Sequence, residues 1–298
     1  MGTPKSLREM RTFLRRMFCD PNIIPYPQPL RYIIALAVSI VRHSKSWEKY
    51  NKIGGSPLKE ATETLAGELQ KCSNIETYIA YSYSNPQIKT VVNEMVSKGI
   101  TDMTIIPMYP QWSYSTTRSI LQDIERVMPK GIHYTFIKES FNKVLFTEFW
   151  VKQIQKTIEE TGVKHPTLLF SAHSVPQSHI EKGDSYEIST YQSAQSIADS
   201  MNLPFRVGFQ SKIGRIKWAE PDTISVLKEL SNEGIQEILI IPISFLTENL
   251  ETLYDIDVEI IPQFNTIFKT IKKVSLAEST ENLIPLFHEI VLHKWWHC

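Results

Sequence analysis

Two stretches of this chain read alike, and this repetition constrains the fold more than any other feature. Residues 91–108 and 226–243 each combine an amphipathic helical pattern, a glycine and a short apolar run that ends at a proline. The two glycines, Gly99 and Gly234, lie 135 residues apart. A glycine that ends a helix before a short apolar strand is typical of the second half of a βαβ unit. The repetition therefore predicts parallel strands joined by helices in both halves of the chain.

An earlier strand is expected in each half. The apolar runs Thr77–Tyr83 and Phe205–Gln210 precede the two repeated elements. Alternating strands and helices predict parallel sheets that are covered on both faces. We therefore expect an α/β fold of two similar doubly wound lobes, each with a parallel four-stranded sheet flanked by helices.

The expected boundaries follow from the repeat. We expect a first α/β lobe with an apolar lip over residues 1–140 and a second α/β lobe over residues 141–270. We expect residues 271–298 to form a C-terminal helix that packs back toward the first lobe. A doubly wound domain normally opens with a strand, whereas this chain opens on Gly2-Thr3-Pro4 and a helical pattern over Leu7–Phe18. We expect the first strand of lobe one to be missing and the true start of the protein to lie upstream.

Composition excludes several classes of protein. Lys and Arg total 32, as do Asp and Glu, so no net charge favours a nucleic acid. The three cysteines are far apart and match no zinc or cluster motif, which indicates reduced thiols. The N-terminus does not match a signal peptide, and the apolar segment Tyr32–Val41 is about half of the ~20 residues that cross a bilayer. These features predict a cytoplasmic protein.

A histidine follows the apolar run Leu168–Phe170. His173 is thereby expected where a strand meets its loop, the edge at which doubly wound sheets bind ligands. An imidazole accepts a proton or binds a metal near neutral pH. A purely structural histidine at a strand end is equally compatible with this position, so the surrounding residues must decide.

Acidic residues follow the second repeated element at regular spacing. Glu251, Asp255 and Glu259 lie four residues apart and would share one face of a helix. Like charges at this spacing destabilise an isolated helix by roughly 0.2–0.5 kcal/mol per pair. Such a row indicates either a functional use or a solvated acidic face.

Aromatic side chains follow other predicted strands, in residues 109–117 and 208–218. An aromatic-lined cleft with a histidine and carboxylates would suit a large, flat, apolar ligand. The apolar stretch from Tyr26 to Val41 predicts either a hydrophobic lip or a buried helix. No G-x-S-x-G, P-loop or G-x-G-x-x-G motif is present, which argues against a serine hydrolase, a P-loop enzyme or a dinucleotide-binding enzyme.

At these residues the chain resembles the ferrochelatase family, lyases that insert Fe(II) into a porphyrin in haem biosynthesis. The resemblance spans nearly the whole chain in the family's order and implies the chelatase fold. The matching blocks are Asp20-Pro21, Gly54–Pro57, Tyr109–Thr117, Ser171–Pro176 with Gly183-Asp184, Phe209–Gly214 through Trp218 and Pro221, and Phe245–Tyr254.

The resemblance also implies roles for individual residues. His173 and Glu251 would be the catalytic pair that binds Fe(II) and accepts protons, and Asp255 and Glu259 would continue an acidic line. The aromatic residues that would bind the porphyrin are Tyr109, Trp218 and Phe245. Fe(II) would be a substrate, no organic cofactor is expected, and no iron–sulfur cluster is expected because Tyr114 stands where some members place a cluster ligand.

Two residues depart from the family's pattern. Asn249 stands where many members have histidine, and Ser82 where an arginine or lysine is common. Two alternatives therefore stay open: a porphyrin- or haem-binding relative with reduced or lost activity, and a chelatase for another metal. The apolar lip suggests a location that is cytoplasmic or peripheral to the inner membrane, with contact through this lip.

Overall fold

The structure is a computed structural model that describes residues 1–138, 143–212, 216–277 and 279–293. The chain divides into two compact units. The first contains Met1–Pro107, Ser113–Lys138 and the residues from His288 onward, and the second contains Met108–Trp112 and Glu139–Phe287. The short segment Met108–Trp112 thus groups with the second unit although its position in the chain suggested the first.

Helices dominate the first unit. A buried apolar stripe on α1 includes Met10, Leu14 and Phe18, and Ser6 begins this helix by accepting a hydrogen bond from the backbone of Glu9. The elements are α1 (Leu7–Phe18), α2 (Gln28–Lys52), α3 (Leu58–Ser73), α4 (Ile88–Ser97), β1 (Asp102–Ile105), the π-helix η1 (Tyr114–Arg118), α5 (Ser119–Val127) and β2 (His133–Phe136).

The prediction of four strands in the first lobe is wrong for the described residues. Their sheet in this unit has two parallel strands, β1 and β2. The expected strand over Thr77–Tyr83 forms only an isolated bridge, between Tyr81 and Gln87. The chain turns back there, because Tyr81 N–H donates to the carbonyl of Pro86 and Ile88 N–H donates to that of Tyr81. Apolar side chains favour an extended segment, but a strand also needs a neighbour along its length.

The second unit contains a four-stranded parallel sheet in the order β4-β3-β5-β6. This part of the two-lobe prediction is confirmed. The elements are α6 (Lys143–Thr161), β3 (Thr167–His173), α7 (Gln177–Ile180), α8 (Tyr186–Met201), β4 (Phe205–Gln210), α9 (Thr223–Asn232), β5 (Glu237–Ile241), the π-helix η2 (Glu251–Ile260), the 3-10 turn η3 (Ile261–Gln263), β6 (Thr270–Lys273) and α10 (Thr280–His293). Residues 294–298 of the expected C-terminal helix lie outside the described residues.

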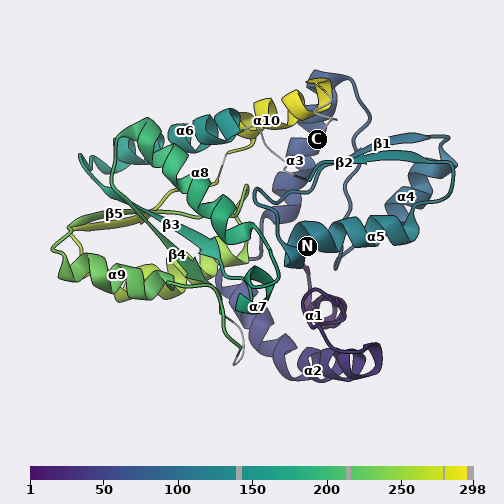
Figure 1. Cartoon of the computed structure of the whole chain (residues 1–298), viewed down its shortest axis with the longest axis horizontal. Helices are drawn as coiled ribbons and strands as arrows, with labels where there is room; N and C mark the ends of the chain where they lie inside the picture. The colour runs from purple at the N-terminus through teal and green to yellow at the C-terminus, as the bar shows by residue number, and fades with distance from the viewer. Residues whose placement is uncertain (139–142, 213–215, 278, 294–298) are drawn as a thin grey trace. The chain divides into compact units, whose positions relative to one another are not determined.

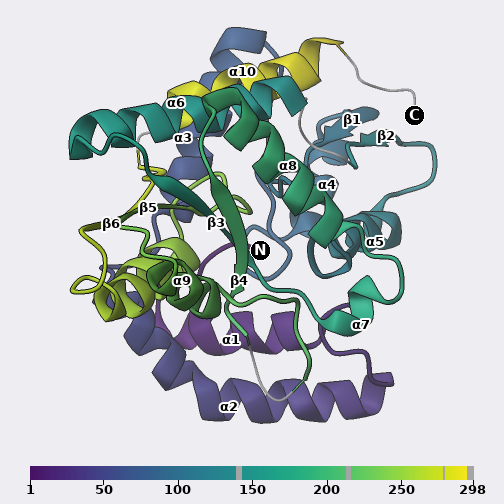
Figure 2. The ribbon, with the colours of Figure 1, turned by 60° about the vertical axis from the view of Figure 1, so that its left-hand side comes forward.

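Helices cover both faces of this sheet. α6 and α8 lie on one side and α9 on the other (Figures 1 and 2). On the α9 side, Leu227 and Ile256 pack with Ile240 of the sheet in one buried apolar cluster, so η2 shares this face with α9. Because both faces are buried, β3 and β5 are nearly continuous apolar runs.

The repeated element has the predicted local structure in both units. α4 leads into β1 and α9 leads into β5. Gly99 and Gly234 both have positive φ, at 81° and 77°, and follow the ends of their helices. A left-handed residue at this position is the common way to end a helix, and glycine adopts it without steric cost.

Candidate active site

His173 is the last residue of β3, as the sequence predicted. Its backbone N–H donates to Ser244 Oγ at 3.0 Å, which ties the end of β3 to the loop after β5. Its ring Nδ1 lies 2.8 Å from the carbonyl oxygen of Ser174. Since a carbonyl can only accept, Nδ1 carries the hydrogen, and in the neutral ring Nε2 keeps its lone pair. That nitrogen can take a proton or bind a metal.

Glu251 is the first residue of η2, and its side chain is half-buried. Burial raises the pKa of the Glu251 carboxyl above its usual range, the nearby His173 opposes this shift, and Asp255 adds to it. His173 and Asp255 therefore lie near enough to Glu251 for their charges to affect its carboxyl. A carboxyl with a raised pKa is suited to accepting a proton.

The acidic line leads from this pair to solvent. Asp255 is half-buried and its Oδ2 accepts a hydrogen bond of 2.6 Å from Ser211 Oγ, directly after β4. Glu259, one residue before the end of η2 at Ile260, is exposed. Among the described residues no group of three or more His, Cys, Asp or Glu side chains forms a ready metal cluster.

The helix that carries these carboxylates differs from the expected α-helix. Over Glu251–Ile260 the backbone forms a π-helix, with hydrogen bonds between residues five apart. π-Helical segments are rare, occur mostly as single-turn bulges within α-helices, and are frequently found at functional sites. The periodicity of the sequence did not distinguish the two forms, because side chains four residues apart lie near one face in both.

Asn249 has a structural role that sequence reasoning missed. Its Oδ1 accepts from the backbone N–H of Thr252 at 3.0 Å, and Thr252 Oγ1 accepts from the backbone N–H of Asn249 at 2.9 Å. This reciprocal pair fixes the start of η2 in the manner of a capping box. The Asn-x-x-Thr spacing was the signal for it.

Trp218 and Phe245 lie on the loops that hold His173. Trp218 forms an antiparallel bridge with Pro176, and Ala219 N–H donates to the carbonyl of Val175 at 2.9 Å. Phe245 follows Ser244 directly, and both aromatic side chains are half-buried.

Tyr109 joins the same unit through its own segment. The amide of Gln111 donates to the carbonyl of Ile243 at 3.4 Å, so this segment lies at the loop after β5. The Tyr109 side chain is half-buried. All seven residues expected at the site therefore belong to the second unit, whereas Ser82 belongs to the first.

The sequence is similar to known proteins over most of its length. The family model described as ferrochelatase matches residues 1–294. The chain is 35% identical over 275 residues to the ferrochelatase of Gloeothece citriformis, which covers 87% of this chain and 71% of that protein. It is 32% identical over 265 residues to the ferrochelatase of Aquifex aeolicus, covering 86% and 84%.

Solved structures resemble the fold at lower sequence identity. SirB from Bacillus subtilis with Fe3+ matches with a TM-score of 0.57 and 15% identity, covering 80% of this chain and 93% of that one. CbiX, described as the terminal enzyme of siroheme biosynthesis in denitrifying bacteria, matches with a TM-score of 0.52 and 12% identity, covering 78% and 92%. These matches support a chelatase-like fold.

Proposed function

This chain belongs to the ferrochelatase family, and we propose that it inserts Fe(II) into a porphyrin through the His173–Glu251 pair. The observation that carries this proposal is the juxtaposition of an imidazole whose Nε2 keeps its lone pair with a carboxyl whose pKa is raised by burial. His173 ends β3 and Glu251 begins η2, and both belong to the second unit.

The chemistry requires groups of these types. A porphyrin loses two pyrrole N–H protons as Fe(II) enters, and Fe(II) loses its water ligands. His173 Nε2 and the Glu251 carboxylate can accept protons, and imidazole and carboxylate both bind Fe(II). Asp255 and Glu259 extend from this pair toward solvent, where they would attract the hydrated cation and accept released protons. Tyr109, Trp218 and Phe245 offer aromatic faces to the macrocycle.

The test is anaerobic insertion of Fe(II) into protoporphyrin, followed by absorbance. His173→Ala should lower kcat by about 100-fold or more, the usual contribution of a positioned base. His165→Ala is the matched control, because His165 is exposed and precedes the opposite end of β3. Equal rates for wild type and His173→Ala would contradict the role of His173. Tight porphyrin binding without insertion by the wild type would instead identify a binding relative.

We also propose that the first unit contacts a membrane surface through α2. The residues of α2 that are buried include the small Ala35 and Ser39, whereas several of its large apolar side chains are exposed. Those exposed by 46–78% are Leu30, Tyr32, Ile33, Leu36, Ile40 and Val41. Such an exposed apolar face marks an interaction surface. Among the described residues, no helix has the length and hydropathy needed to cross a bilayer.

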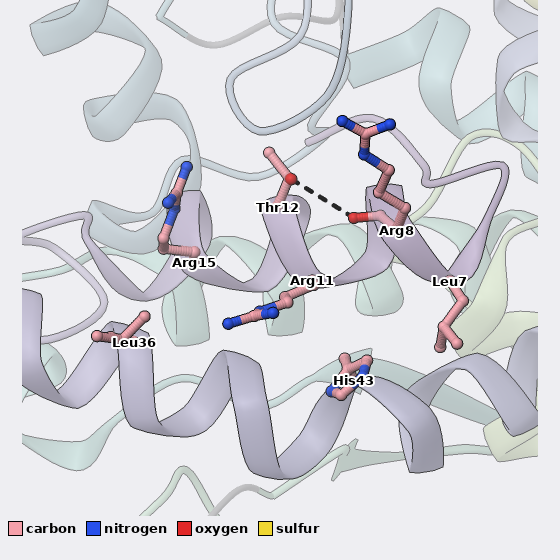
Figure 3. A pocket seen from close by; sticks show the side chains of 7 residues that line it. All are labelled: Leu7, Arg8, Arg11, Thr12, Arg15, Leu36 and His43. Carbon is pink, nitrogen blue, oxygen red and sulfur yellow. Dashed lines mark hydrogen bonds between the residues drawn. The ribbon is translucent and has the colours of Figure 1, made fainter.

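Charge favours an anionic membrane. Residues 1–52 hold ten Lys and Arg but three Asp and Glu, in a chain whose net charge is zero. A groove of about 470 Å³ between α1 and α2 is lined by Leu7, Arg8, Arg11, Thr12, Arg15, Leu36 and His43 (Figure 3). Basic groups beside an apolar helix face suit insertion among anionic lipid headgroups, with about 1 kcal/mol per basic residue near the surface.

Vesicle co-sedimentation tests this contact. The wild type should bind vesicles that contain phosphatidylglycerol more strongly than pure phosphatidylcholine vesicles. Replacing Ile33, Ile40 and Val41 together with serine should reduce binding at least tenfold. Ile188→Ser is the control, because Ile188 is 63% exposed on α8 of the other unit. Equal binding by both variants would rule out α2 as the contact.

A further inference from the structure

A buried lysine on β6 contacts the helix that carries Glu251 and Asp255. The side chain of Lys273 is 6% exposed. Its ammonium donates to Glu248 Oε2 at 2.9 Å, Asp257 Oδ2 at 2.7 Å and the carbonyl of Thr252 at 3.2 Å. An ammonium has three hydrogens, so these acceptors use all of them. Every acceptor belongs to η2 or to the segment just before it.

The spacing of two of these acceptors is that of the π-helix itself. Thr252 and Asp257 are five residues apart, the separation of the two residues joined by a π-helical hydrogen bond. One ammonium therefore holds the carbonyl of the first and the carboxylate of the second. In an α-helix bonds join residues four apart and side chains advance by about 100° per residue. Tightening this turn to that form would turn Asp257 away from Lys273.

Glu248 connects the same lysine to the start of η2. Its Oε2 also accepts from Thr252 Oγ1, and its Oε1 accepts from the backbone N–H of Leu276 at 2.9 Å. The Glu248 side chain is 7% exposed. A buried carboxylate with these partners is costly to disturb, because loss of one partner leaves a charge without compensation.

Lys273 pairs with two of the acidic residues in this segment. Residues 248–259 contain five carboxylates. Burial raises the pKa of Asp257, and Lys273 opposes that shift. Glu248 and Asp257 are thus paired with the ammonium on the β6 side. Glu251, Asp255 and Glu259 form the acidic line, where His173 and Asp255 act on the Glu251 carboxyl.

From this geometry we infer that Lys273 is a positioning residue, which holds η2 in its π-helical form and so sets where Glu251 and Asp255 lie. We call this positioning of η2 by Lys273 the clamp, and the contacts of Lys273 alone support it. Its consequence for metal insertion rests on the function proposed above.

Three variants test the inference. Lys273→Met keeps the length of the side chain and removes its donors, and we expect kcat/KM for Fe(II) to fall at least tenfold while the porphyrin Kd changes less than threefold. Lys273→Arg, which keeps the charge and several donors, should recover most of the activity. Lys269→Met is the control, because Lys269 lies just before β6, is 73% exposed and pairs with Glu237, away from η2.

A crystal structure of the Lys273→Met protein separates the clamp from the function. Hydrogen bonds between residues four apart over 251–260 would support the inference, and an unchanged π-helix would overturn it. A lower Tm with unchanged kinetics for Fe(II) would also overturn it, since the lysine would then only stabilise the fold. If Lys273→Met does not fold, Asp257→Asn gives the same test with a smaller expected loss. A wild type that inserts no iron, together with a shifted η2 in the variant, would refute the proposed function alone.

Discussion

The two copies of the repeated element differ in their surroundings more than in their local structure. Both consist of a helix, a glycine with positive φ and a strand, and a π-helix follows each strand. β5 pairs with β3 on one side and β6 on the other, and it is buried from Ile238 to Ile241. β1 pairs with β2, and only Met103 of its residues is buried.

The two copies also differ in whether they carry a buried carboxylate. The repeat offset of 135 residues aligns Glu251 of η2 with Thr116 of η1. Only the copy that follows the four-stranded sheet has an acid at this position, close to a histidine from the neighbouring strand. Packing against the four-stranded sheet supplies the burial that raises the pKa of the Glu251 carboxyl, and the end of β3 supplies its neighbour His173.

The largest expected effect tests that alignment directly. Glu251→Gln keeps the size of the side chain but removes its ability to accept a proton, so kcat for Fe(II) insertion should fall by about 100- to 10,000-fold. Thr116→Val at the equivalent position should stay within about threefold of wild type. Similar losses of kcat from both changes would mean that the two π-helices contribute equally to Fe(II) insertion, which would contradict the difference between the two copies.

The strands should differ next in stability. Ile240 of β5 is fully buried, and Ile240→Ala should lower the free energy of unfolding by about 2–5 kcal/mol. Ile105, its equivalent in β1, is half-buried, and Ile105→Ala should cost about 1 kcal/mol. Urea denaturation followed by circular dichroism measures both. Equal costs would show that the first sheet is as well packed as the second.

The two glycines should behave alike, because their role is local. No atom lies within 4 Å of a Cβ built on Gly99 or Gly234, so alanine would meet no clash there. The remaining cost is that of a left-handed backbone, about 1–2 kcal/mol for each Gly→Ala change. If Gly234→Ala lowered the free energy of unfolding much more than Gly99→Ala in the same urea denaturation, tertiary contacts would contribute to the helix end at Gly234.

The smallest effect is expected in the pH dependence of stability. The folded state raises the pKa of Glu251 above its ordinary value near 4.5, so the ionised carboxyl destabilises the fold. This penalty is absent below pH 4.5 and complete above the raised pKa. The wild type should therefore lose stability relative to Glu251→Gln as pH rises through that window. Parallel pH profiles of the two proteins would contradict the raised pKa.

The local elements of this protein could be predicted from neighbouring residues along the chain. Period, caps and turn residues are properties of neighbouring residues, so the helix Leu7–Phe18, the strand Phe205–Gln210 and the place of His173 at a strand end were predictable. The resemblance of the motif blocks to known enzymes identified the family.

Only the tertiary structure decided the rest. Thr77–Tyr83 has the composition of a strand but lacks a strand partner among the described residues, and strand formation depends on hydrogen bonds to distant segments. The acidic row of residues 251–259 was visible in the sequence, but its π-helical form was not. The π-helical form depends on contacts such as those of Lys273, which lies on β6. Contacts with a distant strand do not appear in the periodicity of residues 251–259.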